Sequence, residues 1–151
     1  MTNTEVHELL LEAYNDELET VMNYLANSIV LDGVRAEEIK KSLEADIDEE
    51  LTHARRLGER LKQLDSVPPG SQACSARQEH LQPPEDTTDV LAVIEGVIEA
   101  EEEAIATYRS LINAAEAADD PVTEDLAVQL LADEEAHRTE FRGFRREYAD
   151  D

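Results

Sequence analysis

Two short motifs combine a carboxylate with an imidazole: Glu50-Leu-Thr-His53 and Glu134-Glu-Ala-His137. Residues three apart on a helix lie on the same side, so each glutamate and histidine can share one metal ion. A mixed set of carboxylate and imidazole ligands suits iron, manganese or zinc better than magnesium or calcium. The single cysteine, Cys74, is far from both motifs in the sequence, which excludes a cysteine-rich zinc or iron–sulfur site.

Both motifs belong to an internal repeat with an offset of 84 residues. Four pairs of residues follow this offset: Glu17 and Glu101, Tyr24 and Tyr108, Glu50 and Glu134, and His53 and His137. A Glu-x-x-His pair arises easily by chance in so acidic a chain, whereas this shared offset does not. The chain therefore predicts two copies of one helical hairpin, packed about a pseudo-twofold axis.

Each of the four repeated glutamates lies on an apolar stripe rather than on a polar face. Glu17, for example, follows Tyr14 and precedes Val21 at helical spacing. All four glutamates fall near the middle of their predicted helices, so they converge at one level of the core. Four buried carboxylates cannot all stay ionised without cations between them. Two divalent cations would neutralise them, which predicts a two-metal site.

The expected arrangement gives every repeated residue a role in that site. Glu50 and Glu134 bridge the two metals, His53 and His137 each bind one metal, and Glu17 and Glu101 are terminal ligands. Tyr24 and Tyr108 lie two turns beyond Glu17 and Glu101, as hydrogen-bond donors or redox-active neighbours of the site; a buried tyrosine with a satisfied hydroxyl is an equal interpretation. Asp46 lies one turn before Glu50 and could support the ligands, but a solvated residue is the favoured interpretation. His7 and His80 are interpreted as surface residues, and Cys74 as incidental.

Hydrophobic periodicity predicts four helices, over about 4–31, 34–64, 88–117 and 121–148, within a single domain 1–151. The segment 65–87 contains Pro68-Pro69-Gly70 and Pro83-Pro84, and is predicted to be an irregular linker. Short turns make helices one and two, and helices three and four, antiparallel neighbours. The linker of roughly 20 residues, at ~3.3 Å per residue, can run the length of a bundle. This pattern predicts an all-α four-helix bundle with one long crossover between helices two and three.

The formal net charge is −24, from 37 acidic and 13 basic residues. Such a chain lacks the basic clusters that bind nucleic acids, and it is repelled by an anionic membrane surface. The acidic, lysine-poor composition resembles that of salt-accumulating halophiles; a role in drawing metal cations inward is a second interpretation, and the two can coexist. The N-terminus has no basic stretch leading into a long apolar run, so we expect no signal peptide, no membrane span and a cytoplasmic protein.

The four helical motifs resemble those of the ferritin-like superfamily, and within it those of bacterioferritins and Dps-like ferritins. Asp16-Glu-Leu-Glu-Thr-Val-Met-Asn-Tyr24 and Asp48-Glu-Glu-Leu-Thr-His-Ala54 are similar to the first- and second-helix motifs of bacterioferritins. Glu101-Glu-Glu-Ala-Ile-Ala-Thr-Tyr108 and Asp133-Glu-Glu-Ala-His137 resemble the third- and fourth-helix motifs of Dps-like ferritins. The resemblance covers nearly the whole chain except the linker, and implies a ferritin-like fold.

The resemblance also implies an activity. The six glutamates and histidines would form a ferroxidase centre with two irons per subunit, which oxidises Fe(II) to Fe(III) with peroxide or dioxygen. The subunits would form a homo-oligomeric shell that stores ferric mineral, detoxifies iron and protects against oxidative stress. The chain ends soon after the fourth helix, which favours a dodecamer over a shell of 24. Leu51 occupies the position of the haem-binding methionine of bacterioferritins, so we expect no haem.

Two other functions remain open at this point. One is a di-metal oxidase or peroxidase without storage, with iron or manganese, similar to a rubrerythrin without its rubredoxin part or to a manganese catalase. The other is a cargo or adaptor bundle whose metal only stabilises the fold. The size of the assembly separates storage from the other two functions, and a single-turnover oxidation separates the adaptor from both enzymes.

Overall fold

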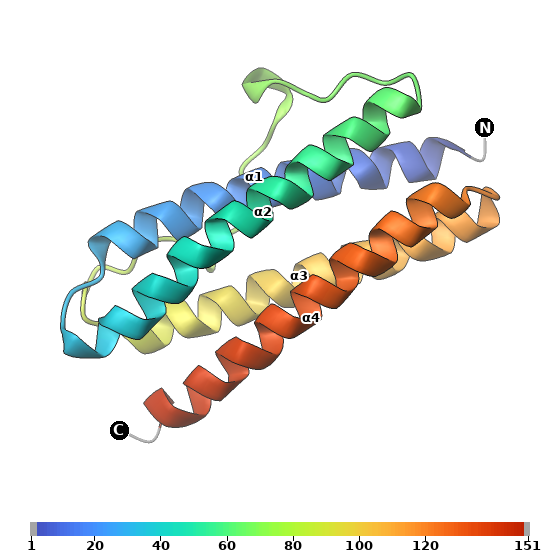
Figure 1. Ribbon diagram of the computed structural model, residues 1–151. Helices are drawn as coiled ribbons and strands as arrows, with labels where there is room; N and C mark the ends of the chain where they lie inside the picture. The colour runs from blue at the N-terminus through green and yellow to red at the C-terminus, as the bar shows by residue number, and fades with distance from the viewer. Residues whose placement is uncertain (1–2, 150–151) are drawn as a thin grey trace.

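Four long helices account for most of the computed structural model, which describes residues 3–149 (Figure 1). They are α1 (Asn3–Val30), α2 (Glu37–Gln63), α3 (Val90–Ala117) and α4 (Pro121–Ala149). Two short 3-10 turns, Val34–Ala36 and Ser71–Ala73, complete the regular structure, and the described residues contain no β-strand. The predicted all-α four-helix bundle is confirmed.

The crossover between α2 and α3 runs along the outside of α1 to the far end of the bundle (Figure 1). Its irregular backbone needs hydrogen-bond partners, and side chains of α1 supply several of them. The Asn15 amide pairs with both the N–H and the carbonyl of Ser75, at 2.7 and 2.9 Å. The Glu19 carboxylate accepts hydrogen bonds from the N–H groups of Arg77 and Gln78. The crossover is thus fixed to α1 before it reaches α3.

Two helices begin later than the sequence predicts. Gly33, with φ of 104°, reverses the chain after α1, and the 3-10 turn Val34–Ala36 follows, so α2 begins at Glu37 instead of 34. The third helix begins at Val90 instead of 88, because Asp89 is the N-cap and its carboxylate accepts a hydrogen bond from the Ala92 N–H.

The crossover packs against α3 at Gly96. A Cβ at this position would lie 2.4 Å from the carbonyl oxygen of His80, closer than such atoms can approach. Backbone, not a flexible side chain, occupies the space, so neither partner can move aside cheaply. The absence of a side chain at Gly96 therefore allows the crossover to pack directly on α3.

Gly96→Ala should lower the free energy of unfolding by about 1–3 kcal/mol, because it overpacks this contact. Gly143→Ala is the matched control: it is also in a helix, but its Cβ would meet nothing within 4 Å. This second change should raise the free energy of unfolding by about 0.5–1 kcal/mol through the helix propensity of alanine. Urea denaturation of both variants measures the difference, and a Gly96→Ala protein as stable as wild type would contradict the packing argument.

Hydrophobic side chains form two clusters, one on each side of the middle of the bundle. One contains Leu31, Ile39, Leu43, Ile94 and Phe141. The other contains Leu10, Leu57, Leu61, Leu111 and Leu130. Along each helix the repeated glutamate falls between residues of these two clusters, so a buried polar layer separates them. None of the described helices is long and apolar enough to cross a membrane.

Candidate metal centre

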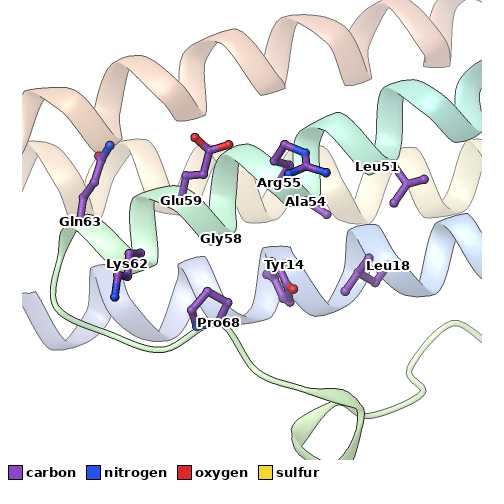
Figure 2. A pocket seen from close by; sticks show the side chains of 10 residues that line it. All are labelled: Tyr14, Leu18, Leu51, Ala54, Arg55, Gly58, Glu59, Lys62, Gln63 and Pro68. Carbon is purple, nitrogen blue, oxygen red and sulfur yellow. The ribbon is translucent and has the colours of Figure 1, made fainter.

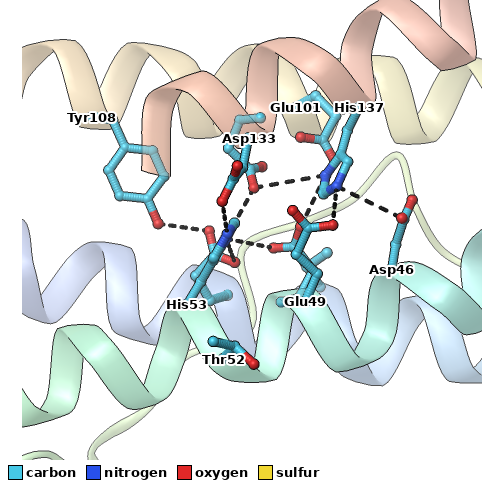
Figure 3. A network of polar contacts seen from close by, with 12 residues as sticks. Asp46, Glu49, Thr52, His53, Glu101, Tyr108, Asp133 and His137 are labelled. Carbon is cyan, nitrogen blue, oxygen red and sulfur yellow. Dashed lines mark hydrogen bonds and ion pairs between the residues drawn. The ribbon is translucent and has the colours of Figure 1, made fainter. Parts of the chain in front are cut away.

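The polar layer brings together all six predicted site residues from the four helices. Figure 3 labels three of them, His53, Glu101 and His137, with carboxylates that surround them. Every one of them is buried, and the largest exposed fraction is 7%, at His137. The six are Glu17 of α1, Glu50 and His53 of α2, Glu101 of α3, and Glu134 and His137 of α4. Burial of four carboxylates at one level is expensive unless opposite charge compensates them.

These residues form two overlapping groups of potential metal ligands. Glu17 and His53 belong to one group, Glu101 and His137 to the other, and Glu50 and Glu134 to both. Within each group the ligand atoms lie within 4.8 Å of one another. Two atoms that bind the same metal at about 2.1 Å lie no more than about 4.2 Å apart, so each group is close to the size of one coordination sphere. Glu50 and Glu134 lie where carboxylates could bridge two ions.

Each of the six residues also has one buried polar atom without a hydrogen-bond partner among the described residues. Leaving such an atom unpaired costs about 1–3 kcal/mol, and six in one layer need a shared explanation. These atoms are Glu17 Oε2, Glu50 Oε1, His53 Nδ1, Glu101 Oε2, Glu134 Oε1 and His137 Nδ1. Once any bound proton is displaced, each of these atoms has a lone pair that can bind a cation, so the residues fit a pair of metal ions.

The two histidines are oriented by carboxylates of the opposite hairpin. His53 Nε2 lies 2.9 Å from Asp133 Oδ2, and His137 Nε2 lies 2.8 Å from Glu49 Oε2. An ionised carboxylate only accepts hydrogen bonds, so Nε2 of each ring carries the proton. The Nδ1 atoms then face the glutamates: His53 Nδ1 lies 3.2 Å from Glu134 Oε1. Pairs of this kind hold a histidine in the tautomer and orientation that a metal requires.

Both tyrosines donate hydrogen bonds to glutamates of the opposite hairpin. The Tyr24 hydroxyl donates to Glu101 Oε1 at 2.6 Å, and the Tyr108 hydroxyl to Glu17 Oε1 at 2.7 Å. The repeated glutamate on each tyrosine's own helix is seven residues away, or about 10 Å along the helix axis. It is therefore too distant to accept a hydrogen bond from that tyrosine. Burial, with the negative charge of nearby glutamates, raises the pKa of both phenols well above 10, so each remains a donor.

Sequence reasoning missed two of these supporting carboxylates, Glu49 and Asp133. The repeat contained the signal, since they are acidic at the same offset of 84 and directly precede Glu50 and Glu134. The interpretation of Asp46 as solvated is wrong. It is only 8% exposed and lies 3.6 Å from His137 Nε2, and burial raises its pKa to about 7.

The other histidines lie outside these two groups. His80 is at the surface, with its Nε2 3.0 Å from Glu99. His7 is half-buried and pairs with the Ser66 hydroxyl at 2.6 Å. Cys74 is a free, partly exposed cysteine in the crossover.

Without cations, the six-residue layer retains protons. Burial and the neighbouring carboxylates raise the pKa of Glu50 and of Glu134 well above the usual range. Burial would raise the pKa of Glu17 too, but the adjacent Glu50 and His53 and the hydrogen bond from Tyr108 outweigh it and lower the pKa. Burial opposes the charging of His137, yet the adjacent Glu101 and other carboxylates raise its pKa to about 10. A metal ion that binds here must displace such protons.

Comparisons with known proteins agree with this architecture. The profile of a family described as "Ferritin-like domain" matches residues 7–149. A similar fold occurs in a solved structure titled "Crystal structure of ferritin like, diiron-carboxylate proteins from Bacillus anthracis str. Ames". The two chains superpose with a TM-score of 0.85 and 23% identity, over 96% of this chain and 98% of the other. No curated protein matches the chain in sequence.

Proposed function

This chain belongs to the family of ferritin-like domains, and we propose that it is a di-iron ferroxidase that oxidises Fe(II) to Fe(III) with peroxide or dioxygen. The observation that carries the proposal is the set of six unpaired buried atoms, one from each of the six repeated glutamates and histidines. Carboxylate and imidazole donors suit iron. The same donors also suit manganese and zinc. The site is a ferroxidase only when the metal that it binds is iron.

The two groups support the following assignment of ligands to the two Fe(II) substrates. His53 and Glu17 hold one ion, His137 and Glu101 hold the other, and Glu50 and Glu134 bridge them. Two Fe(II) ions bring a charge of +4 to four carboxylates, so the layer is neutral before oxidation. Oxidation adds two positive charges, and the buried carboxylates stabilise them in a medium of low dielectric constant. The donor set thus favours the ferric product over the ferrous substrate.

The proposed oxidation is balanced in atoms and electrons. Two Fe(II) ions lose one electron each. These two electrons and two protons reduce one hydrogen peroxide to two waters, or one dioxygen to hydrogen peroxide. The chain holds its ligands in place during this step: Tyr24 and Tyr108 donate to Glu101 and Glu17, while Glu49 and Asp133 fix the two imidazoles.

We also propose that the chain assembles into a cytoplasmic homo-oligomeric shell of the bacterioferritin or Dps-like kind, a dodecamer, in which ferric mineral collects. Support comes from the outer face of α1, where the side chains of Met22, Leu25 and Ile29 are 69%, 50% and 72% exposed. Exposed apolar side chains on one helix face are typical of interaction surfaces. Light scattering tests the assembly, and a monomer at working concentrations would contradict it.

A groove of about 640 Å³ between α1 and α2 adds to this apolar surface. Its lining includes Tyr14, Leu18, Leu51 and Pro68 (Figure 2). Leu51 has no atom that can bind a haem iron, so this groove residue does not support a haem ligand.

Titration of the metal-free protein with Fe(II) under anaerobic conditions, followed by peroxide or air, tests the activity through near-ultraviolet ferric absorbance. We expect saturation at two irons per chain and rapid oxidation. Uptake beyond two irons after oxidation would support storage. Tight binding without oxidation would favour an adaptor with a structural metal, and no binding would overturn the assignment of the six ligands.

A further inference from the structure

A small crevice opens between α1 and α3, whereas the two histidines of the candidate centre lie on α2 and α4. Its volume is about 10 Å³, roughly the space of one water-sized molecule. It is lined by Ala13, Asp16, Glu17, Ala104, Thr107 and Tyr108. Two of these, Glu17 and Tyr108, are the hydrogen-bonded pair beside the candidate centre.

The depth of the lining residues shows which way the crevice leads. Asp16, Ala104 and Thr107 are partly exposed and form the rim. Glu17 and Tyr108 are 3% and 1% exposed and form the floor. Alanine at positions 13 and 104 leaves room between the two helices. The crevice therefore leads from the surface to Glu17, whose Oε2 is one of the unpaired atoms of the centre.

The internal repeat allows the corresponding place in the other half of the molecule to be compared. At the offset of 84, the crevice positions become Val97, Ala100, Glu101, Thr20, Asn23 and Tyr24. Val97 is larger than its counterpart Ala13, and it is fully buried. Thr20 and Asn23 are also buried, in contrast to the partly exposed Ala104 and Thr107.

The crossover covers this second position. The Gln78 amide donates to the Thr20 hydroxyl at 2.6 Å and accepts from the Asn23 amide at 2.9 Å. Gln78 is itself only 8% exposed. The way to Glu101 is thus closed by a hydrogen-bonded side chain, while a crevice the size of one water molecule leads to Glu17. The two halves differ at this point although their ligands are repeated.

We propose that the crevice between α1 and α3 is the route by which the oxidant, a small neutral molecule such as dioxygen or hydrogen peroxide, reaches the centre beside Glu17. This proposal rests on the proposed ferroxidase function. The crevice is too small for a divalent cation with its shell of waters. Dioxygen and peroxide have two heavy atoms each, so the partly exposed Asp16 or Thr107 must move outward to admit them.

The charged groups on the other side of the centre fit a separate route for cations. On α2 and α4, Glu49 and Asp133 are about two-fifths exposed and contact the histidines, and Asp46 lies beside them. Such carboxylates attract divalent cations to the α2–α4 side. Separate routes allow the oxidant to arrive while both Fe(II) ions are held.

Ala104→Leu tests the route by filling the crevice with a larger side chain. We expect the rate constant of Fe(II) oxidation to fall by about tenfold or more, as for closure of an access path, while anaerobic Fe(II) binding keeps its stoichiometry. Ala106→Leu is the matched control, since it makes the same change at an exposed position of α3. If the wild type oxidises Fe(II) and Ala104→Leu does so at the rate of Ala106→Leu, the route is wrong.

A second measurement uses neither a variant nor iron. Dissolved dioxygen is paramagnetic and speeds the relaxation of methyl protons that it contacts. In metal-free wild type with labelled alanine and valine methyls, we expect a larger effect at Ala13 than at its counterpart Val97, although both side chains are buried. Equal effects would overturn the proposal. A wild type that oxidises no Fe(II) would reject the ferroxidase function, and this measurement would then decide separately whether the crevice admits oxygen.

Discussion

Glu50→Ala should abolish rapid Fe(II) oxidation, with a loss of more than about a hundredfold in the rate constant. Glu50 belongs to both ligand groups, so its removal takes one ligand from each metal. Loss of a residue that only supports a ligand typically costs about 10–100-fold in metal affinity or activity, and loss of a shared ligand should cost more. Stopped-flow ferric absorbance after mixing the Fe(II)-loaded protein with peroxide measures the effect.

A matched control for this variant lies on the same helix. Glu44 is exposed, and Glu44→Ala removes the same charge without touching the buried layer, so it should oxidise Fe(II) at the wild-type rate. His137→Ala should behave like Glu50→Ala, because His137 is the one imidazole of its group. Circular dichroism in high salt should show wild-type helix content in all three variants. Wild-type oxidation rates in both ligand variants would remove the basis for the site.

Zn(II), which occupies the same ligands without redox chemistry, should raise the melting temperature by about 10 °C or more at pH 8 and by much less at pH 5.5. A ligand at a hundred times its dissociation constant stabilises the folded state by about 2.7 kcal/mol per site. For a chain of this size, each kcal/mol shifts the melting temperature by roughly 2–4 °C. Two occupied sites therefore give the expected shift.

The pH dependence follows from the protons that the metal displaces. The pKa values of Glu50 and Glu134 are raised in the folded state. Their protonated forms stabilise the fold fully below the usual value of 4.5, and this stability is lost as pH rises. His137 acts in the same direction between 6.5 and about 10. The metal-free protein should thus lose stability as pH rises, over the range in which metal binding strengthens.

Thermal unfolding at both pH values, with and without Zn(II), checks this prediction. About 1 M salt shortens the screening length to roughly 3 Å and suppresses the repulsion among surface carboxylates, which would also destabilise the protein at high pH. The double variant Glu50→Gln and Glu134→Gln is the control. Without metal it should melt higher than wild type at pH 8, and Zn(II) should add little. A wild type whose metal-free melting temperature is the same at both pH values would contradict the proton-retaining layer.

Most of the fold could be predicted from the sequence, because the helices are long and strongly periodic, and because turn residues mark their ends. The late start of α2 at Glu37 could not be predicted from the sequence. It depends on the reversal at Gly33 and the 3-10 turn that follows, and this turn consists of residues with ordinary helical patterning. The path of the crossover also depends on contacts between distant segments, such as the Asn15 amide with the backbone of Ser75.

The six convergent residues could be predicted because the repeat and the apolar stripes place them on core faces. Their supporting partners depend on how the helices are rotated about their axes. Glu49 and Asp133 lie at the edge of the core face of their helices. At this edge a small rotation of the helix about its axis decides whether a side chain reaches solvent or the neighbouring helix. The same holds for Asp46, whose contact with His137 joins α2 to α4.

Every supporting contact of the centre joins one hairpin to the other: Tyr24 to Glu101, Tyr108 to Glu17, Asp133 to His53, and Glu49 to His137. A peptide with only one hairpin could build such a centre only by pairing with a copy of itself, and both copies would then carry identical residues. When the two copies are joined in one chain, a residue in one copy can change while its counterpart in the other copy stays the same. Asp46 against Leu130, and Ala13 against Val97, are differences that a pair of identical chains could not maintain.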